Sequence, residues 1–370
     1  MPENSRRPPA EHEQAPQLNL MATLVRLGAI GLLSLLVTAA FAYTGGWLTP
    51  DRLTPVRIID RFEQVNGPHP GFRRNHAKGV CFAGVFESNG QGLRFSKASV
   101  FDMGQVPVVG RFALAGGQPY LADSPQAVRS MALLFMLPDG EEWRTGMNDI
   151  PVFPLSTPEA FYEQLAASRL DPTTGKPDPA LMANFLASHP ETVRALALIK
   201  NRPVSSGFAN DTFNSLDAFF FVDSDGNAVP VRWSMVPGEP FAAAADLPSL
   251  DKNYLFDDVI ARIERQPLEW HLVVTIGQKG DPTNDATIAW PDDRERVDLG
   301  TLFIDHVEGE ISGRCRDVNF DPLILPNGIK PSDDPLLSAR SAAYSQSFRR
   351  RAGEVEEPSA VTTPAADKGA

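Results

Sequence analysis

The chain contains little cysteine, histidine and tyrosine. Only two cysteines, Cys81 and Cys315, occur in 370 residues, which excludes a disulfide scaffold and any zinc or iron–sulfur site held by four thiolates. They can form one disulfide, and two buried thiols are the alternative. Six histidines and five tyrosines stand against 22 phenylalanines, so each titratable aromatic residue is a separate candidate for chemistry.

Positive charge and several common motifs are also scarce. The 34 basic residues are outnumbered by 46 acidic ones, which gives a net charge of −12. A broad positive surface is therefore not expected, and we predict no nucleic-acid partner. The sequence has no GxGxxG after a strand, no GxxxxGK[ST], no HExxH and no GxSxG. Nucleotide-binding, zinc-protease and α/β-hydrolase functions thus lack their anchoring residues.

Both ends of the chain have the composition of disordered segments. Residues 1–20 are rich in proline, glutamate and glutamine without periodicity, and residues 352–370 are small, polar and acidic. Such segments bury too little apolar surface to offset the entropy of ordering. We predict a disordered arm and a disordered tail, with the chemistry between them.

One long apolar run follows the arm. Residues 27–47 carry no charge over 21 positions, enough for a helix to cross a hydrocarbon core of about 30 Å. Three arginines (Arg6, Arg7 and Arg26) precede the run, and Tyr43 and Trp47 lie near its end. Together they predict a membrane anchor with the main body outside the cytoplasm, in the periplasm. The small residues at 40–42 resemble a cleavage site, so a secreted protein that has lost a signal peptide is the alternative.

The body alternates strand-rich and helix-rich stretches. The pattern of residues 80–137 predicts several strands with short connections, which favours antiparallel pairing. Thr157 and Pro158 begin a helical stretch. Strands resume after residue 217 and are interrupted by an amphipathic helix at 250–266. This order predicts an α+β fold and no doubly wound parallel sheet.

Four motifs collect the rare residues. RxxHAKG spans residues 73–79, and an N(D/N)xPxF element spans 148–153. A proline-rich lead-in at 326–335 precedes RxxxY at 340–344. In this order and spacing the motifs resemble those of the haem catalases, and in particular the short, often exported branch called catalase-related peroxidases. The resemblance covers residues 52–351 and implies a catalase-like antiparallel β-barrel with accompanying helices, and a haem cofactor.

The resemblance also implies roles for individual residues. His76 matches the distal histidine, which moves a proton between the two peroxide oxygens. Asn148 matches the distal asparagine, whose amide stabilises charge on the departing oxygen. Tyr344 matches the axial iron ligand, which binds as a phenolate. Arg340 lies one helical turn earlier, so its guanidinium can donate to that phenolate and favour the anion.

Five further residues match cofactor contacts of the family. Arg73, Arg111 and Arg351 correspond to arginines that pair with haem propionates, although Arg351 could equally belong to a solvated basic end. Phe153 and Phe161 correspond to aromatic residues that line the distal pocket, and ordinary core packing is the alternative for each.

Two departures from the larger catalases fall near His76. Those enzymes have a serine that accepts from the distal histidine at the position of Ala113, and an apolar residue at the position of Asn75. We therefore expect His76 to be less firmly held, and the Asn75 amide to compete for the imidazole or to polarise the pocket. Both changes predict weak dismutation of hydrogen peroxide relative to peroxidase turnover.

The sequence thus predicts a membrane-tethered haem peroxidase acting against oxidative stress. It would reduce hydrogen peroxide or organic hydroperoxides with an unidentified organic electron donor. Two alternatives remain: an enzyme that rearranges hydroperoxides without net reduction, and a non-catalytic haem-binding module. The last has no need of a distal acid–base pair. Both a monomer and a homodimer are compatible with the sequence.

Overall fold

A computed structural model describes residues 20–49, 52–171, 174–244 and 251–363. The predicted disordered arm lies outside the described residues, apart from Leu20. The chain divides into two units, residues 1–54 and residues 55–370, and each is described by itself.

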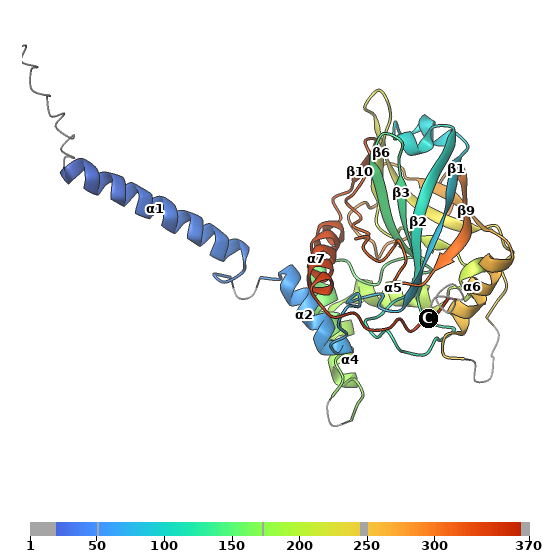
Figure 1. Ribbon diagram of the computed structural model, residues 1–370, viewed down its shortest axis with the longest axis horizontal. Helices are drawn as coiled ribbons and strands as arrows, with labels where there is room; N and C mark the ends of the chain where they lie inside the picture. Colours follow the sequence, from blue (N-terminus) through green and yellow to red (C-terminus); the bar gives the residue numbers. More distant parts are fainter. Residues whose placement is uncertain (1–19, 50–51, 172–173, 245–250, 364–370) are drawn as a thin grey trace, which may run out of the picture. The chain divides into compact units, whose positions relative to one another are not determined.

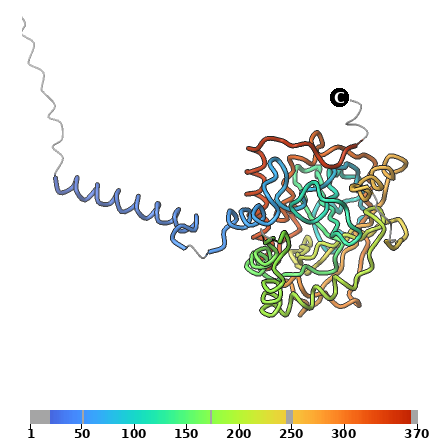
Figure 2. The backbone as a smooth tube through the Cα atoms, turned by 90° about the horizontal axis from the view of Figure 1, so that it is seen from below, coloured from blue at the N-terminus to red at the C-terminus, as the bar shows by residue number. Residues whose placement is uncertain are grey.

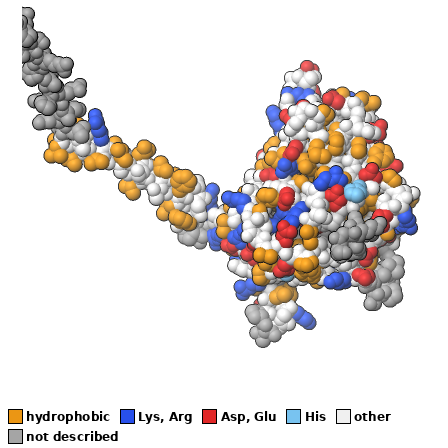
Figure 3. Space-filling view, in the orientation of Figure 1, with side chains coloured by type: hydrophobic (Ala, Val, Ile, Leu, Met, Phe, Trp, Pro, Cys, Tyr) orange, Lys and Arg blue, Asp and Glu red, His pale blue; other side chains and the backbone are white. Residues whose placement is uncertain are grey.

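The described residues of the first unit form one apolar helix, α1 (Leu20–Thr44). None of its 25 residues is buried, and apolar side chains cover it (Figure 3). It is long and apolar enough to cross a membrane, a test that a signal sequence also passes. The helix differs from the predicted run 27–47 at both ends. It includes Arg26 and stops at Thr44 because Gly46 takes a left-handed φ of 80°.

An antiparallel β-barrel forms the centre of the second unit (Figure 1). Eight strands close a ring in the order β7-β5-β4-β3-β2-β1-β9-β8, and β7 pairs with β8. Two short strands, β10 and β6, continue the sheet beyond β7. The strands are β1 (Gly79–Ser88), β2 (Gly104–Leu114), β3 (Arg129–Met136), β4 (Glu142–Asn148), β5 (Phe213–Asn214), β6 (Phe219–Val222), β7 (Ala228–Pro237), β8 (Leu268–Ile276), β9 (Arg296–Glu308) and β10 (Ile329–Pro331).

Aromatic side chains fill the barrel. Phe112, Trp143, Trp233 and Trp270 are at most 1% exposed and belong to one hydrophobic core. Because side chains alternate along a strand, the neighbours of these residues point out of the barrel. The interior is a packed core, so any site must be built on the outer face.

Helices cover part of that outer face. They are α2 (Pro55–Asn66), α3 (Pro158–Ala167), α4 (Pro179–Ser188), α5 (Pro190–Lys200), α6 (Tyr254–Arg265) and α7 (Pro335–Ala352), with short 3₁₀ turns at Gln91–Arg94, Ser99–Phe101 and Phe208–Asn210. Helices α2 and α7 lie side by side (Figures 1 and 2), and both contact α3. The predicted α+β fold with an antiparallel barrel and accompanying helices is confirmed.

The segment after α7 differs from the predicted disordered tail. Val361 is only 2% exposed, the hydroxyl of Tyr120 donates to the carbonyl of Pro358 at 2.9 Å, and Glu354 pairs with Arg74. These partners hold residues 353–363 against the body, which composition alone could not indicate. Residues 364–370 lie outside the described part of the chain.

Candidate active site

A cavity of about 200 Å³ lies on the outer face of the barrel. Strands β2, β3 and β4 form one wall, and helices α2 and α7 contribute to the opposite side. Alternation explains which residues of β2 face it: Phe112 joins the core, while its neighbours Arg111 and Ala113 line the cavity. The structure brings all nine sequence-predicted site residues to this cavity: Arg73, His76, Arg111, Asn148, Phe153, Phe161, Arg340, Tyr344 and Arg351.

The backbone of His76 is held in an unusual conformation just before β1. Its φ of 55° is left-handed, which side chains other than glycine seldom adopt. The side-chain oxygen of Asn75 accepts from the backbone N–H of His76 at 3.0 Å and from that of Gly116 at 2.9 Å. Asn75 was predicted to compete for the imidazole. Its oxygen instead fixes the turn that aims His76 into the cavity.

The imidazole of His76 is kept neutral by its surroundings. Burial lowers its pKa to about 3, and the charges of Arg111, Arg340 and Arg73 act in the same direction. A neutral imidazole at physiological pH can accept a proton from a bound molecule.

Ser130 supplies the hydroxyl that the sequence reading considered missing. It lies on β3 directly opposite Ala113 of β2, and its Oγ is 3.0 Å from Nδ1 of His76. The expectation that His76 is less firmly held is therefore wrong. No motif included Ser130, but once β2 and β3 are paired in register, the alternation places it beside the position where larger catalases carry the serine.

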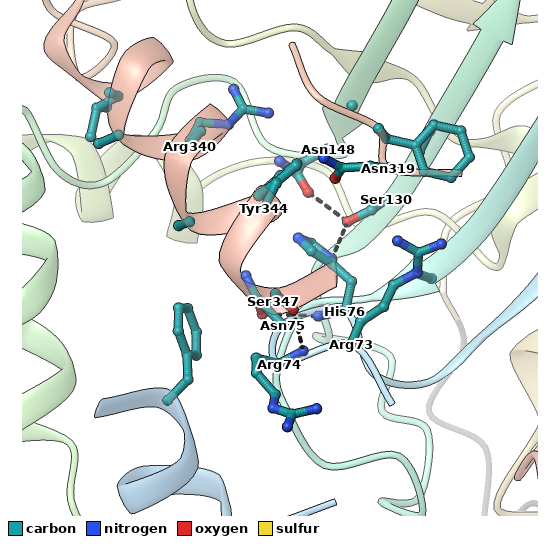
Figure 4. A pocket seen from close by; sticks show the side chains of 18 of the residues that line it. Arg73, Arg74, Asn75, His76, Ser130, Asn148, Asn319, Arg340, Tyr344 and Ser347 are labelled. Carbon is teal, nitrogen blue, oxygen red and sulfur yellow. Dashed lines mark hydrogen bonds between the residues drawn. The ribbon is translucent and has the colours of Figure 1, made fainter. Parts of the chain in front are cut away.

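The same hydroxyl contacts both distal residues (Figure 4). Ser130 Oγ donates to Oδ1 of Asn148 at 2.5 Å, so its oxygen is left to accept from Nδ1–H of His76. This arrangement leaves Nε2 of His76 as a proton acceptor and the amide NH₂ of Asn148 as a donor. The Ser130 hydroxyl thus determines which atoms of His76 and Asn148 donate hydrogen bonds and which accept them.

Tyr344 lies on the opposite side of the cavity with a charged partner on the same helix. The guanidinium carbon of Arg340 is 5.8 Å from the centre of the Tyr344 ring, as expected for residues four apart. Arg340 also pairs with the buried Asp217. Burial acts to lower the pKa of Arg340, but attraction to Asp217 and Tyr344 raises it above its usual value. The sequence motifs did not include Asp217, which follows Leu216 with a strained φ of 66°.

Three arginines converge at one end of the cavity. Arg73, Arg111 and Arg351 all line it and surround Glu310, which sequence reasoning also missed. Two of their nitrogens, Nε of Arg73 and Nη2 of Arg351, are buried without a hydrogen-bond partner among the described residues. Orphaned buried donors of this kind fit a ligand with carboxylates, as haem has.

The side of the cavity formed by α2 and α3 is apolar. Phe161 lies 6.2 Å from Phe153 and 5.6 Å from Phe62, measured between ring centres. Ile58 and Ile59 line the cavity near them. A flat apolar group with charged ends matches this distribution of apolar and cationic lining.

Comparisons with known proteins show the family of the chain. The family model described as "Catalase" matches residues 46–367. The chain is 37% identical over 326 residues to a catalase-related peroxidase of Synechococcus elongatus, covering 87% of this chain and 95% of that protein. It is 34% identical over 305 residues to one of Mycolicibacterium paratuberculosis, covering 81% and 96%.

Similarity of fold extends to the larger enzymes. A fungal catalase structure superposes with a TM-score of 0.69 at 18% identity, over 95% of this chain and 67% of that chain. The family match spans the barrel and every residue placed around the cavity. This chain belongs to the catalase family, in its short branch.

Proposed function

We propose that this chain is a haem peroxidase that uses Tyr344 as the axial ligand and His76 and Asn148 as the distal pair. As a member of this family it is an oxidoreductase acting on peroxide. Haem would supply an iron that exchanges electrons with peroxide. Its carboxylates would bind at Arg73 and the two neighbouring arginines, and its flat ring would lie against the apolar lining.

The distal pair would manage the protons of the reaction. Reduction of ROOH to ROH and water consumes two electrons and two protons. Nε2 of His76, unprotonated at neutral pH, takes the proton from one peroxide oxygen and returns it to the oxygen that leaves. The NH₂ of Asn148 donates to that oxygen as negative charge develops on it. The electrons come from an organic donor or, in dismutation, from a second hydrogen peroxide.

The observation that carries this proposal is the contact of Ser130 with both distal residues. A module that only binds haem needs an axial ligand. It does not need a histidine and an amide that are held so that an acceptor and a donor face the cavity. The apolar lining supports organic hydroperoxides as substrates beside hydrogen peroxide. Since the Ser130 hydroxyl is present, the main reason for expecting weak dismutation no longer applies. We expect oxygen evolution as well as donor oxidation, measured on the same preparation.

Optical spectra of the full chain test the proposal. We expect a ferric haem spectrum typical of tyrosinate ligation, which changes when peroxide is added. Tyr344→Phe should lose the tyrosinate bands and most of the bound haem, because phenylalanine has no oxygen to bind iron. The matched control is Tyr120→Phe, which removes a surface hydroxyl bonded to Pro358. Purified chain without haem, or a Tyr344→Phe spectrum like that of the wild type, would contradict the axial assignment.

We further propose that α1 anchors the protein in a membrane with the barrel outside the cytoplasm. Its apolar surface supports the anchor, and Arg26 near its start supports the orientation, because positive charge favours the cytoplasmic side. The body also contains a disulfide between Cys81 and Cys315, and such bonds persist in oxidising compartments. The peroxide and the electron donor would then be molecules of that compartment.

A further inference from the structure

The three arginines at the end of the cavity share contacts with one stretch of chain, residues 309–318, here named the clamp segment. It follows β9 and consists of turns. The clamp segment contains Cys315, whose disulfide partner Cys81 lies within β1. Both cysteines are fully buried. The disulfide therefore fixes the segment to the barrel wall.

The clamp segment accepts hydrogen bonds from two of the arginines through its backbone. Nη2 of Arg73 donates to the carbonyls of Cys315, Arg316 and Val318 at 3.0, 3.2 and 3.1 Å. Nη1 of Arg351 donates to the carbonyl of Arg316 at 2.6 Å. Two residues that are 278 positions apart in numbering are thus oriented by the same few peptide groups.

Glu310 of the clamp segment orients the third arginine. Its two oxygens accept from Nε and Nη2 of Arg111, each at 2.9 Å. Oε1 is also 3.8 Å from Nε of Arg73. Such a two-point contact fixes both the direction and the plane of a guanidinium group.

The cluster is nevertheless short of negative charge. Among the described residues, Glu310 is the one carboxylate that pairs with Arg73 and Arg111. Asp317 and Arg316 act on Arg351 with opposite signs, so positive charge stays in excess. Burial lowers the pKa of Arg73 well below its usual value, and repulsion from Arg111 and Arg351 lowers it further. Two additional carboxylates would balance the excess and could bond the orphaned nitrogens of Arg73 and Arg351.

We infer that the clamp segment is part of the cofactor site: it holds the three arginines in place for two carboxylates, and the Cys81–Cys315 disulfide keeps it there. The inference rests on the proposed haem function. It assigns positioning roles to Glu310 and to the backbone of residues 315–318. It also makes retention of the cofactor depend on an intact disulfide.

Release of the cofactor from the loaded full chain tests this inference. The variant Cys81→Ser/Cys315→Ser is loaded with haem, or with haem dimethyl ester, in which both carboxylates are blocked. Transfer to an excess of a haem-scavenging protein gives the release rate. We expect the variant to release haem at least about 10-fold faster than the wild type. Release of the ester should be equally fast from both, because the ester cannot pair with the arginines.

The controls separate positioning from general loosening. Arg314 lies in the clamp segment, but its side chain is 56% exposed and pairs with Glu308 at 2.7 Å, so Arg314→Gln should release haem like the wild type. Equal haem release from the disulfide variant and the wild type would overturn the inference. So would a variant that releases haem and its ester faster by the same factor.

A measurement without haem keeps the inference separate from the proposed function. In the haem-free full chain, modification of arginines by phenylglyoxal is followed by mass spectrometry. Arg73 and Arg351 should react several-fold faster in the disulfide variant, because the clamp segment no longer orders them, while the exposed Arg314 should react alike in both. Unchanged modification would overturn the inference even if the chain bound no haem. A wild type that binds no haem would overturn only the proposed function.

Discussion

The hydroxyl of Ser130 decides which atoms of His76 and Asn148 face the cavity. It donates to Asn148 and is left to accept from the imidazole. Without it, the ring of His76 and the amide of Asn148 could each turn over. For each group, one of the two orientations would then present the wrong atom to a peroxide.

Ser130→Ala should therefore slow the reaction with peroxide on the order of 10-fold, with haem binding unchanged. The rescue variant is Ala113→Ser/Ser130→Ala, which moves the hydroxyl to the paired residue of β2. It should recover part of the lost rate. Rapid-mixing measurements of the haem spectrum give these rates directly. A rate unaffected by Ser130→Ala, or a double variant no faster than the single one, would contradict this role.

The depressed pKa of His76 also predicts a pH effect on stability. The folded pKa is about 3, against about 6.5 in the unfolded chain. As pH falls below 6.5, only the unfolded chain gains this proton, so the fold should lose about 1.4 kcal/mol per pH unit until about pH 3. His76→Asn should lack this loss, and asparagine tolerates the left-handed backbone.

Denaturant unfolding of the haem-free chain at pH 8, 6.5 and 5 gives the comparison. The difference in free energy of unfolding between His76→Asn and the wild type should be constant from pH 8 to 6.5. It should then shift in favour of the variant at pH 5. Parallel curves throughout would show that His76 does not titrate as described.

At the scale of elements, α7 carries the axial candidate and depends on how it begins. Asp334 caps the helix by accepting from the N–H of Leu336 at 2.9 Å. Burial and the charge of Asp217 raise the pKa of Asp334 to about 7. Its other oxygen, Oδ2, is buried without a hydrogen-bond partner among the described residues.

Asp334→Asn should keep the helix cap and remove the free-energy cost of ionising a buried carboxyl group in the folded chain. In the unfolded wild type Asp334 ionises near pH 3.8, whereas in the folded chain it keeps its proton until about pH 7. The wild type therefore loses stability as the pH rises through that interval. The variant should gain in melting temperature relative to the wild type at pH 8, and gain less at pH 5. Asp334→Ala, which lacks a capping oxygen, should lose about 1 kcal/mol at both pH values. An advantage of Asp334→Asn that does not change with pH would contradict the raised pKa.

The sequence predicts individual elements better than the contacts between them. The strand and helix order, the capped start at Thr157 and the RxxxY turn follow from local patterns. Contacts between distant segments do not. Ser130 becomes functional only through strand register, Asp217 only through its pair with Arg340, and Glu310 only because a disulfide draws its segment onto the barrel wall.

For the whole molecule, the division at residue 54 separates the apolar helix from the barrel. On the visible face of the barrel unit, acidic and basic side chains are intermixed (Figure 3), which is typical of a surface in contact with water. A chain that begins at residue 52 should therefore stay in the soluble fraction and bind haem with the spectrum of the full chain. The full chain should sediment with membranes and require detergent for release. Equal partitioning of the two chains would contradict the anchor.

The pairing of Ala113 with Ser130 has a consequence for how such sites diverge. The two residues sit opposite one another on neighbouring strands, and both face the cavity. A lineage that carried serine at both positions would never lack the hydroxyl, and loss of either one would be tolerated. Two substitutions can therefore move the hydroxyl from one strand to the next while it stays at the same place beside the cavity. The role belongs to that place in the structure and not to one position in the chain.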